Sequence, residues 1–388
     1  MIRVHVLVSA VLMACAAVQG VANAADSPID LPLAKQIFDD TRRASEADSG
    51  KLWGRPIYGP ILFVDPETRA VVANQRDAEG RLTEQVGVFT GALSLQDDVA
   101  NTAYTWAGIR WTMVMWPLPE NRYARARLVT HECFHRIQDQ LGLPGANPSN
   151  NHLDGRDGRI WLRLEWRALA EALIRRGSSR GQAIGDALLF RAHRRMLLPV
   201  AAGQENALEI NEGLAEYTGY RLCGWPKEIS ADRAALRVEQ EEGSASLVRS
   251  FAYASGPAYG ILLDESGKQW RPGLRSDSDL GALLAGAYGI TPLPDTGKQA
   301  EQSARKYDGT YVMAVEAERE QERIQAYARN KAAFIDGPVL VLSLSQEVHY
   351  TFNPRAAEGF GDLGTVYRTT RVTDHWGTLD VSGGALLS

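Results

Sequence analysis

The chain has 388 residues, of which 45% are hydrophobic and 23% are charged, and its formal net charge is −5 at pH 7. This composition is typical of a globular protein, and the length allows a large core in one or two domains. A slightly acidic chain without a basic stripe argues against a nucleic-acid partner.

The first residues have the pattern of an export signal. Arg3 supplies a positive charge, residues 4–18 form an apolar run, and residues 22–24 have the A-x-A pattern of a cleavage site. The run is shorter than a membrane-spanning helix requires, so residues 1–24 are predicted to be a signal peptide that is removed during export to the periplasm or the cell exterior. A second possibility is lipid attachment at Cys15, which ends a string similar to a lipoprotein box.

The rest of the chain contains two cysteines and no candidate membrane span. Cys133 and Cys223 do not make a disulfide framework, and we expect two buried thiols, although an oxidising compartment would permit them to pair. No later stretch is long and apolar enough to predict an integral membrane segment.

In chain order the pattern predicts an α+β protein. Residues 31–46 have the spacing of an amphipathic helix, and residues 55–116 follow as a β-rich part in which turn-like spacers separate short apolar runs. Residues 121–334 are predicted to be mainly helical, with glycine and proline between the segments. Residues 338–388 return to a strand pattern and are predicted to form a small β-rich C-terminal appendage, which leaves residues 25–337 as the main domain.

The last run of the β-rich part, residues 101–116, alternates in polarity and is dense in aromatic residues. It leads directly into a predicted helix that begins after Asn121, so its edge is a candidate for binding an extended substrate. A core strand that only packs is an equally good interpretation of the same pattern.

The predicted helix carries the pattern H-E-x-x-H at residues 131–135. Asn121 is a suitable N-cap for this helix, and Gly142 is a suitable glycine just past its end. On a helix, positions i and i+4 lie on the same face, so His131 and His135 can both direct a ring nitrogen at one zinc ion. Glu132 lies beside them and is positioned to take a proton from a water molecule at that ion.

A second string, residues 211–217, has the pattern N-E-G-x-A-x-Y. H-E-x-x-H followed by N-E-G-x-A-x-Y resembles the gluzincin metallopeptidases, a group that includes thermolysin-like enzymes and zinc aminopeptidases. The resemblance covers these two motifs only. It implies a zincin-like catalytic core within residues 25–337 and a zinc-dependent peptidase activity.

Carried over residue by residue, the resemblance implies that His131, His135 and Glu212 bind zinc and that Glu132 is the catalytic base. Glu216 lies one helical turn after Glu212. It matches the acidic position that in thermolysin-like enzymes hydrogen-bonds a ligand histidine, and such a carboxylate fixes the tautomer of the ligand.

The spacing of the motifs leaves an alternative third ligand open. Glu212 follows His135 by 77 residues, whereas roughly twenty residues separate the two motifs in those families. Glu165 lies 30 residues after His135 among large apolar residues, and a carboxylate buried there would need a partner, either a metal or Arg163 or Arg167. Glu212 is the preferred third ligand because of its motif, and Glu165 is the alternative.

Hydrolysis at zinc also requires a donor that stabilises the developing oxyanion. Residues 252–260 contain Tyr253 and Tyr259 among glycines and a proline that permit close backbone approach. A tyrosine hydroxyl has this role in the zinc aminopeptidases, so both tyrosines are candidates. A turn with packed aromatic side chains is the alternative interpretation.

The sequence therefore predicts an exported metallopeptidase with Zn²⁺ as its cofactor, a peptide or protein as its substrate and Glu132 as its base. Two alternatives remain open: a zinc hydrolase of non-peptide amides, and a secreted binding protein whose zinc site is structural or degenerate. Four protein ligands would favour the binding protein, whereas three ligands in an open cleft favour catalysis.

Overall fold

The computed structural model describes residues 3–6, 28–291, 297–345, 348–352 and 357–388. The chain forms two compact units, which are described separately. The larger unit spans Asn23–Met313, and the smaller unit combines Ala314–Ser388 with the N-terminal residues. Helices and strands both contribute, so the chain has the α+β architecture that the sequence predicts.

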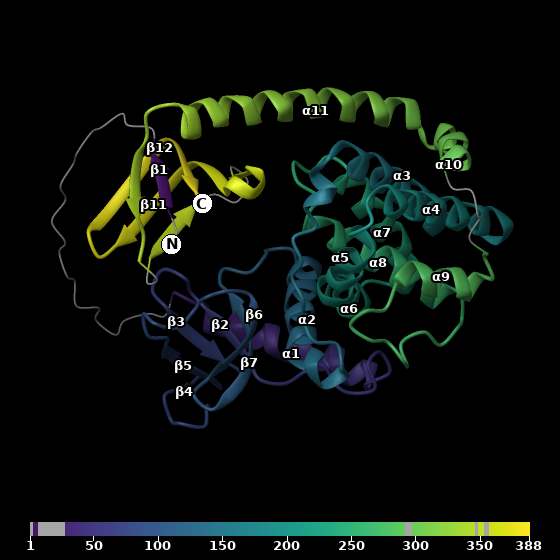
Figure 1. Ribbon diagram of the computed structural model, residues 1–388. Coiled ribbons are helices and arrows are strands. Elements are labelled where there is room, and N and C mark those ends of the chain that lie inside the picture. The colour runs from purple at the N-terminus through teal and green to yellow at the C-terminus, as the bar shows by residue number, and fades with distance from the viewer. Residues whose placement is uncertain (1–2, 7–27, 292–296, 346–347, 353–356) are drawn as a thin grey trace. The chain divides into compact units, whose positions relative to one another are not determined.

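A six-stranded sheet forms the first part of the larger unit (Figure 1), in the strand order β4-β5-β3-β2-β7-β6. Its strands are β2 Ile61–Val64, β3 Ala70–Ala73, β4 Thr83–Gln85, β5 Val88–Ala92, β6 Thr102–Trp106 and β7 Ile109–Met115. Neighbouring strands are antiparallel except β2 and β7, which pair in parallel. β6 therefore lies at one edge of the sheet.

Both faces of this sheet are covered. Ile61 and Phe63 of β2 lie in the main core cluster, whereas Leu62 between them lies in a second cluster on the opposite face. Successive side chains of a strand point to opposite faces, so a continuous apolar run indicates burial on both sides. The main cluster also contains the buried hydrophobic side chains of helices α1 (Leu31–Asp48) and α2 (Arg122–Gln138).

β6 and β7 form a hairpin within the run that the sequence presents as continuous. Ala107 and Gly108 connect the two strands, and their φ angles of 46° and 74° are both positive. Two-residue hairpin loops with positive φ at both positions match the twist of the flanking strands. Only Gly108 signals this turn in the sequence, because alanine rarely adopts positive φ.

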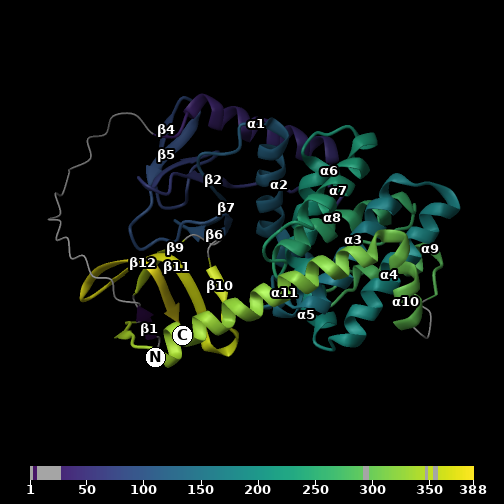
Figure 2. The same cartoon turned by 90° about the horizontal axis from the view of Figure 1, so that it is seen from above.

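Helices form the rest of the larger unit. After α2 they are α3 Arg156–Ile174, α4 Gly177–Leu197, α5 Ala201–Leu208, the π-helix η3 Glu209–Gly213, α6 Leu214–Leu222, α7 Lys227–Glu241, α8 Ser250–Glu265, α9 Leu280–Tyr288 and α10 Gly297–Ala304. Both views place α2 between the sheet and the other helices (Figure 1, Figure 2), and it contacts β6, β7 and α6. None of the described helices is both long enough and apolar enough to cross a bilayer.

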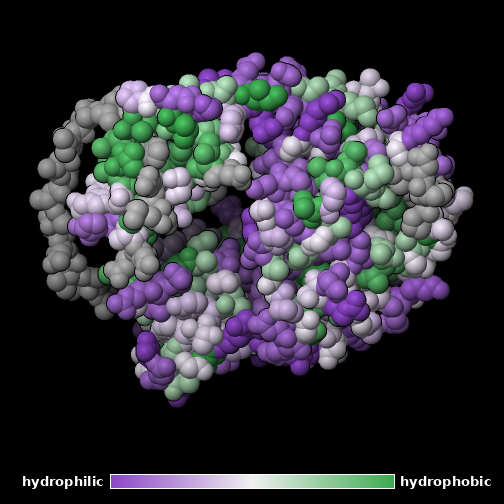
Figure 3. Space-filling model, viewed as in Figure 1, coloured by the Kyte–Doolittle hydropathy of each residue, from purple (hydrophilic) through white to green (hydrophobic). Residues whose placement is uncertain are grey.

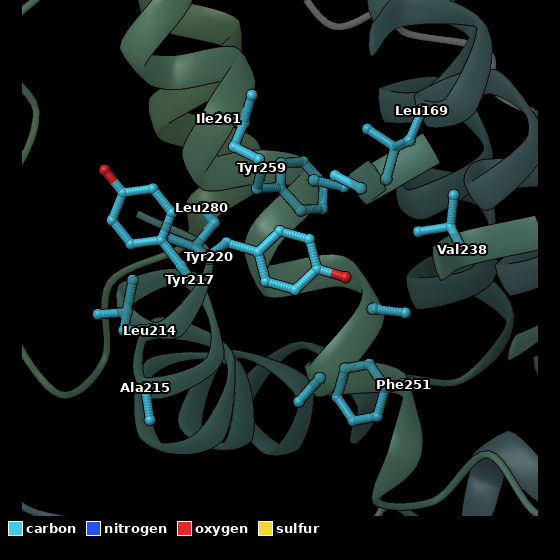
Figure 4. Packing of buried hydrophobic residues seen from close by; sticks show 14 of the residues in the cluster. Leu169, Leu214, Ala215, Tyr217, Tyr220, Val238, Phe251, Tyr259, Ile261 and Leu280 are labelled. Carbon is cyan, nitrogen blue, oxygen red and sulfur yellow. The ribbon is translucent and has the colours of Figure 1, made fainter. Parts of the chain in front are cut away.

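α6 and α8 pack closely at the centre of the helical part (Figure 4). Tyr217 of α6 and Tyr259 of α8 are fully buried there, together with side chains of α3 and α7. Two glycines permit the approach, since a Cβ added to Gly256 would lie 2.2 Å from the Cα of Gly213. A larger residue at Gly256 would push α8 away from the end of η3.

Both cysteines are free and buried, as expected. Cys133 lies in α2 with no exposed surface, and burial raises the pKa of its thiol to about 11. A buried thiol with a raised pKa stays protonated at neutral pH and is a poor nucleophile.

The smaller unit combines part of α11 (Gly309–Lys331) with a second six-stranded antiparallel sheet. Its strands are β8 Leu340–Ser343, β9 His349–Phe352, β10 Ala357–Gly359, β11 Thr365–Asp374, β12 Gly377–Leu387 and the N-terminal β1 Arg3–Val6. β1 lies between β8 and β12 and pairs with both. Residues 7–24 of the predicted signal peptide lie outside the described residues, and export stays a prediction.

Hydrophobic side chains are exposed on the smaller unit. They gather on it in the view of Figure 3, and Leu340 and Val341 of β8 are 44% and 45% exposed. The two core clusters of this unit contain few buried side chains.

Candidate metal centre

α2 begins where the sequence predicts. The side chain of Asn121 accepts hydrogen bonds from the backbone N–H groups of Tyr123 and Ala124 at 3.0 and 3.1 Å, which satisfies two donors of the first turn. The helix ends at Gln138 and continues as a short 3₁₀ turn to Gly142, whose φ of 73° ends it. The face of α2 that carries the H-E-x-x-H pattern borders a cleft of the larger unit.

Three side chains meet at this cleft and could hold a metal ion. His131, His135 and Glu212 each offer one ligand atom, and these atoms lie within 4.8 Å of one another. The two Nε2 atoms are 3.1 Å apart, and Glu212 Oε2 lies 3.5 Å from each of them. Two imidazole nitrogens and a carboxylate oxygen form a donor set suited to a divalent transition metal.

Glu212 reaches the histidines from the π-helix η3, which joins α5 to α6. A π-helical turn is wider than an α-helical turn, and such turns are frequent at functional sites. Gly213 ends η3 against α8, where an added Cβ would lie 3.1 Å from the Cα of Gly256. Close packing on α8 therefore fixes the position of the segment that carries Glu212.

Hydrogen bonds orient both histidine rings. Nδ1 of His131 lies 3.0 Å from Glu216 Oε2, and Nδ1 of His135 lies 2.8 Å from Gln138 Oε1. Because a carboxylate or amide oxygen can only accept, each Nδ1 is the donor, and in the neutral ring that a metal requires each Nε2 would present its lone pair to the centre of the group. Gln138 in turn donates to Asn211 at 3.1 Å, which fixes its amide.

The carboxylates of the group favour a bound cation. Burial by itself lowers the pKa of His131, but its hydrogen bonds to Glu212 and Glu216 raise that pKa to about 10. Burial raises the pKa of Glu212, and the hydrogen bonds from His131 and His135 outweigh this and bring it below its usual range. In the metal-free chain a proton on a histidine therefore neutralises the carboxylates, and a metal ion would replace it.

Glu132 lies in the cleft beside this group without joining it. Its side chain is buried, with 5% exposed, and its Oε2 has no hydrogen-bond partner among the described residues. Burial raises the pKa of this carboxyl group above its usual value. A buried carboxylate oxygen without a partner in the polypeptide is unusual, and it fits a site completed by a water molecule and a metal ion.

Tyr253 lies at the group, whereas Tyr259 does not. The Tyr253 hydroxyl donates to Glu212 Oε2 at 2.5 Å, and its ring stacks on the ring of His131 with centroids 5.5 Å apart. Tyr259 is fully buried in the core (Figure 4), and its hydroxyl donates to Glu165 at 2.7 Å. The prediction that Tyr259 takes part in the site is therefore wrong, because its hydroxyl lies in the core on Glu165, whereas Tyr253 lines the cleft.

Glu165 is also remote from the histidines. Its side chain is fully buried, and it pairs with Arg191 at 3.3 Å and with Arg194 at 2.6 Å. Arg191 and Arg194 therefore satisfy this carboxylate, whereas Arg163 and Arg167, the arginines suggested by the sequence, pair with Glu242. The alternative of Glu165 as the third ligand is therefore overturned, and Glu212 is the carboxylate that lies beside the two histidines.

The cleft itself has a volume of about 1050 Å³ and belongs to the larger unit. Residues of β6, α2, η3 and α8 line it, together with the loop that contains Gly145 and Asn147. The edge strand β6 thus borders the same space as His131, His135 and Glu132. An extended chain in the cleft would run beside backbone groups of β6 that no other described strand uses.

Comparison with protein-family models, with curated proteins and with solved structures finds no match to this chain. The chemistry of the group itself is therefore the guide to function. That group brings together His131, His135 and Glu212, with Glu132 and Tyr253 at its side.

Proposed function

We propose that this protein is a zinc-dependent hydrolase that cleaves peptide bonds. The observation that carries the proposal is the buried carboxylate of Glu132, whose Oε2 lacks a partner beside a group of three metal-binding side chains in an open cleft. Catalytic zinc sites have three protein ligands and keep a further position open, whereas structural sites have four. The group contains three ligands among the described residues, which favours catalysis.

A zinc ion held by the three ligands would supply a Lewis acid that polarises the carbonyl of the scissile bond. Glu132 would take a proton from the attacking water and later give a proton to the leaving amine. Burial supports this role, because the raised pKa of Glu132 makes it a stronger base than an exposed glutamate. Tyr253, whose hydroxyl donates to Glu212 in the metal-free chain, would give up that bond and donate to the developing oxyanion instead.

A peptide is the substrate that the cleft favours. β6 is an edge strand that borders the metal group, so a peptide in extended conformation could add to the sheet through backbone hydrogen bonds. An amide substrate without a repeating backbone would leave this edge unused. The edge strand therefore supports a peptidase over a hydrolase of small amides.

The resemblance of the two motifs to the gluzincins supports the same assignment. The long interval between the motifs consists mainly of α3, α4 and α5, which precede η3 in the helical part. Insertions of this kind are tolerated because loop-closure entropy grows slowly with length. Helices inserted between the motifs leave His135 and Glu212 close together.

Hydrolysis of a peptide library tests the proposal. Zinc-loaded protein should cleave peptides, and protein treated with a chelator should not until zinc is restored. Failure of the zinc-loaded protein to cleave any peptide would contradict a peptidase. Cleavage of small amides alone would instead identify a hydrolase of non-peptide amides.

We also propose export, on the grounds of the predicted signal peptide. Intact-mass measurement of material from the periplasm or the medium should give a chain that begins at Ala25. A lipidated chain that begins at Cys15 would support the alternative. Cleavage after Ala24 would remove β1, which pairs with β8 and β12 here.

A further inference from the structure

Arg249 differs from the other arginines that line the described part of the metal cleft. Arg110 pairs with Asp139, and Arg127 pairs with Glu216. Neither of these carboxylates belongs to the group that can hold a metal. The partner of Arg249 is Glu212, which is itself a member of that group.

The two oxygens of Glu212 face in different directions. Oε2 lies 3.5 Å from Nε2 of both His131 and His135, and Oε1 accepts a hydrogen bond from Arg249 Nη2 at 3.2 Å. The other terminal nitrogen of Arg249 donates to Asn147 Oδ1 at 3.2 Å, and the side chain of Arg249 is 52% exposed. Glu212 therefore lies between this guanidinium and the two histidines, and the guanidinium is open to the cleft.

Metal binding changes the charge balance at this arginine. A divalent ion takes up most of the negative charge of a carboxylate that coordinates it, so a metal-bound Glu212 would neutralise Arg249 only weakly. Arg110 and Arg127 would keep partners that are not ligands. The arginine left in need of an anion is thus the one nearest to the ligand carboxylate.

We propose that Arg249 binds a carboxylate group of the peptide substrate. A guanidinium presents five N–H donors in a planar fork that matches a carboxylate, and the contacts to Asn147 and Glu212 use only part of this capacity. The carboxylate is either the C-terminal group of the substrate or an aspartate or glutamate side chain. This inference deepens the proposed function and rests on it.

The position of Arg249 puts this carboxylate close to the bond that is cleaved. Arg249 directly precedes α8 and Tyr253 lies four residues later, so the two side chains share one face of the helix end. Both donate hydrogen bonds to Glu212. The carboxylate receptor and the proposed oxyanion donor are therefore neighbours, and the preferred substrate carries its carboxylate near the scissile bond.

Peptide binding to the zinc-loaded Glu132→Gln protein tests the proposal without relying on turnover. Fluorescence anisotropy would measure the affinities of two pairs of labelled peptides. The first pair is a peptide with a free C-terminus and the same peptide as its C-terminal amide. The second pair is an amidated peptide that contains glutamate and the same peptide with glutamine in its place. One charged peptide should bind about 10- to 100-fold more tightly than its neutral match, the range for a hydrogen bond to a charged group. The pair that shows the difference identifies the source of the carboxylate.

Variants of the arginines in the cleft show which arginine causes the difference in affinity between charged and neutral peptides. Adding Arg249→Gln should abolish the difference while zinc content stays unchanged, and Arg249→Lys should restore part of it. Arg110→Gln removes the same charge from the cleft wall and should keep the difference. Equal binding of charged and neutral peptides, no peptide binding at all, or an unchanged difference in Arg249→Gln would each overturn the proposal.

The outcomes also separate this proposal from the proposed function. Cleavage of peptides by the wild-type protein without any preference for a carboxylate would overturn the role of Arg249 alone. A carboxylate preference in binding without cleavage by the wild-type protein would support Arg249 and contradict the peptidase.

Discussion

Replacement of Glu132 by glutamine should remove most of the hydrolysis and leave zinc bound. Glutamine has the same size as glutamate, and Oε2 of Glu132 has no hydrogen-bond partner among the described residues, so few contacts are lost. The substitution removes the basic oxygen and none of the three ligand atoms. A positioned general base contributes about 10²- to 10⁴-fold to a rate, so kcat should fall by about that factor, which corresponds to about 3 to 5 kcal/mol in the barrier.

The assay combines steady-state kinetics on a cleaved peptide with metal analysis of the same protein sample. Glu212→Ala is the matched control, because it removes a ligand oxygen and should lose zinc together with activity. Turnover of Glu132→Gln within tenfold of the wild-type value, with zinc bound, would refute the role of Glu132 as the base. Loss of zinc from Glu132→Gln would instead show that this carboxylate is a ligand.

Three further predictions concern the surroundings of the group. Glu216→Gln and Gln138→Leu should each weaken zinc binding by about ten- to a hundredfold, which is the usual effect of losing a hydrogen-bond partner of a ligand histidine. Competition with a chelating dye would measure the zinc affinity. An unchanged affinity would contradict the role of these two hydrogen bonds to the histidines. Tyr253→Phe should lower kcat by about a hundredfold or more, whereas Tyr259→Phe should leave kcat unchanged and lower the free energy of unfolding by about 1 to 3 kcal/mol; the reverse pattern would contradict their placement. In metal-free protein the pKa of His131 is raised from 6.5 to about 10, so the stabilisation by the protonated ring is complete below pH 6.5 and is lost as the pH rises through 10. The Tm of chelator-treated protein should therefore fall over this pH range more than the Tm of zinc-loaded protein. Parallel curves of Tm against pH for the two samples would contradict this prediction.

The sequence could predict those parts of the site that depend on local spacing. His131 and His135 share a helix face because they are four residues apart, and Asn121 caps that helix with the hydrogen bonds expected of its side chain. The contact of Glu216 with His131 also matches the prediction. That contact joins distant segments, and it was predictable only through the resemblance of the second motif.

Other parts of the site depend on tertiary packing and could not be predicted. The glycines and Pro257 are typical of a turn, but α8 continues through them. Tyr259 follows Tyr253 by six residues, so on the helix its side chain lies well away from the face that carries Tyr253. The role of Arg249 depends on how α8 lies against η3, and no local pattern reports that arrangement. Gln138 was detectable in principle, since it follows His135 by three residues on the same helix.

The sequence carries only a weak local signal for the hairpin turn. A two-residue loop is usually recognised by asparagine or aspartate before glycine, and here Ala107 has that place with a φ of 46°. The edge that borders the cleft is consequently β6, and the longer strand β7 lies inside the sheet.

Measurement of bound zinc tests the central claim most directly. Purified wild-type protein, dialysed against zinc and then against metal-free buffer, should retain about one zinc per chain by elemental mass spectrometry, and Glu212→Ala should retain far less. A wild-type value well below one zinc per chain, or equal zinc content in Glu212→Ala and the wild type, would contradict a metal centre formed by His131, His135 and Glu212.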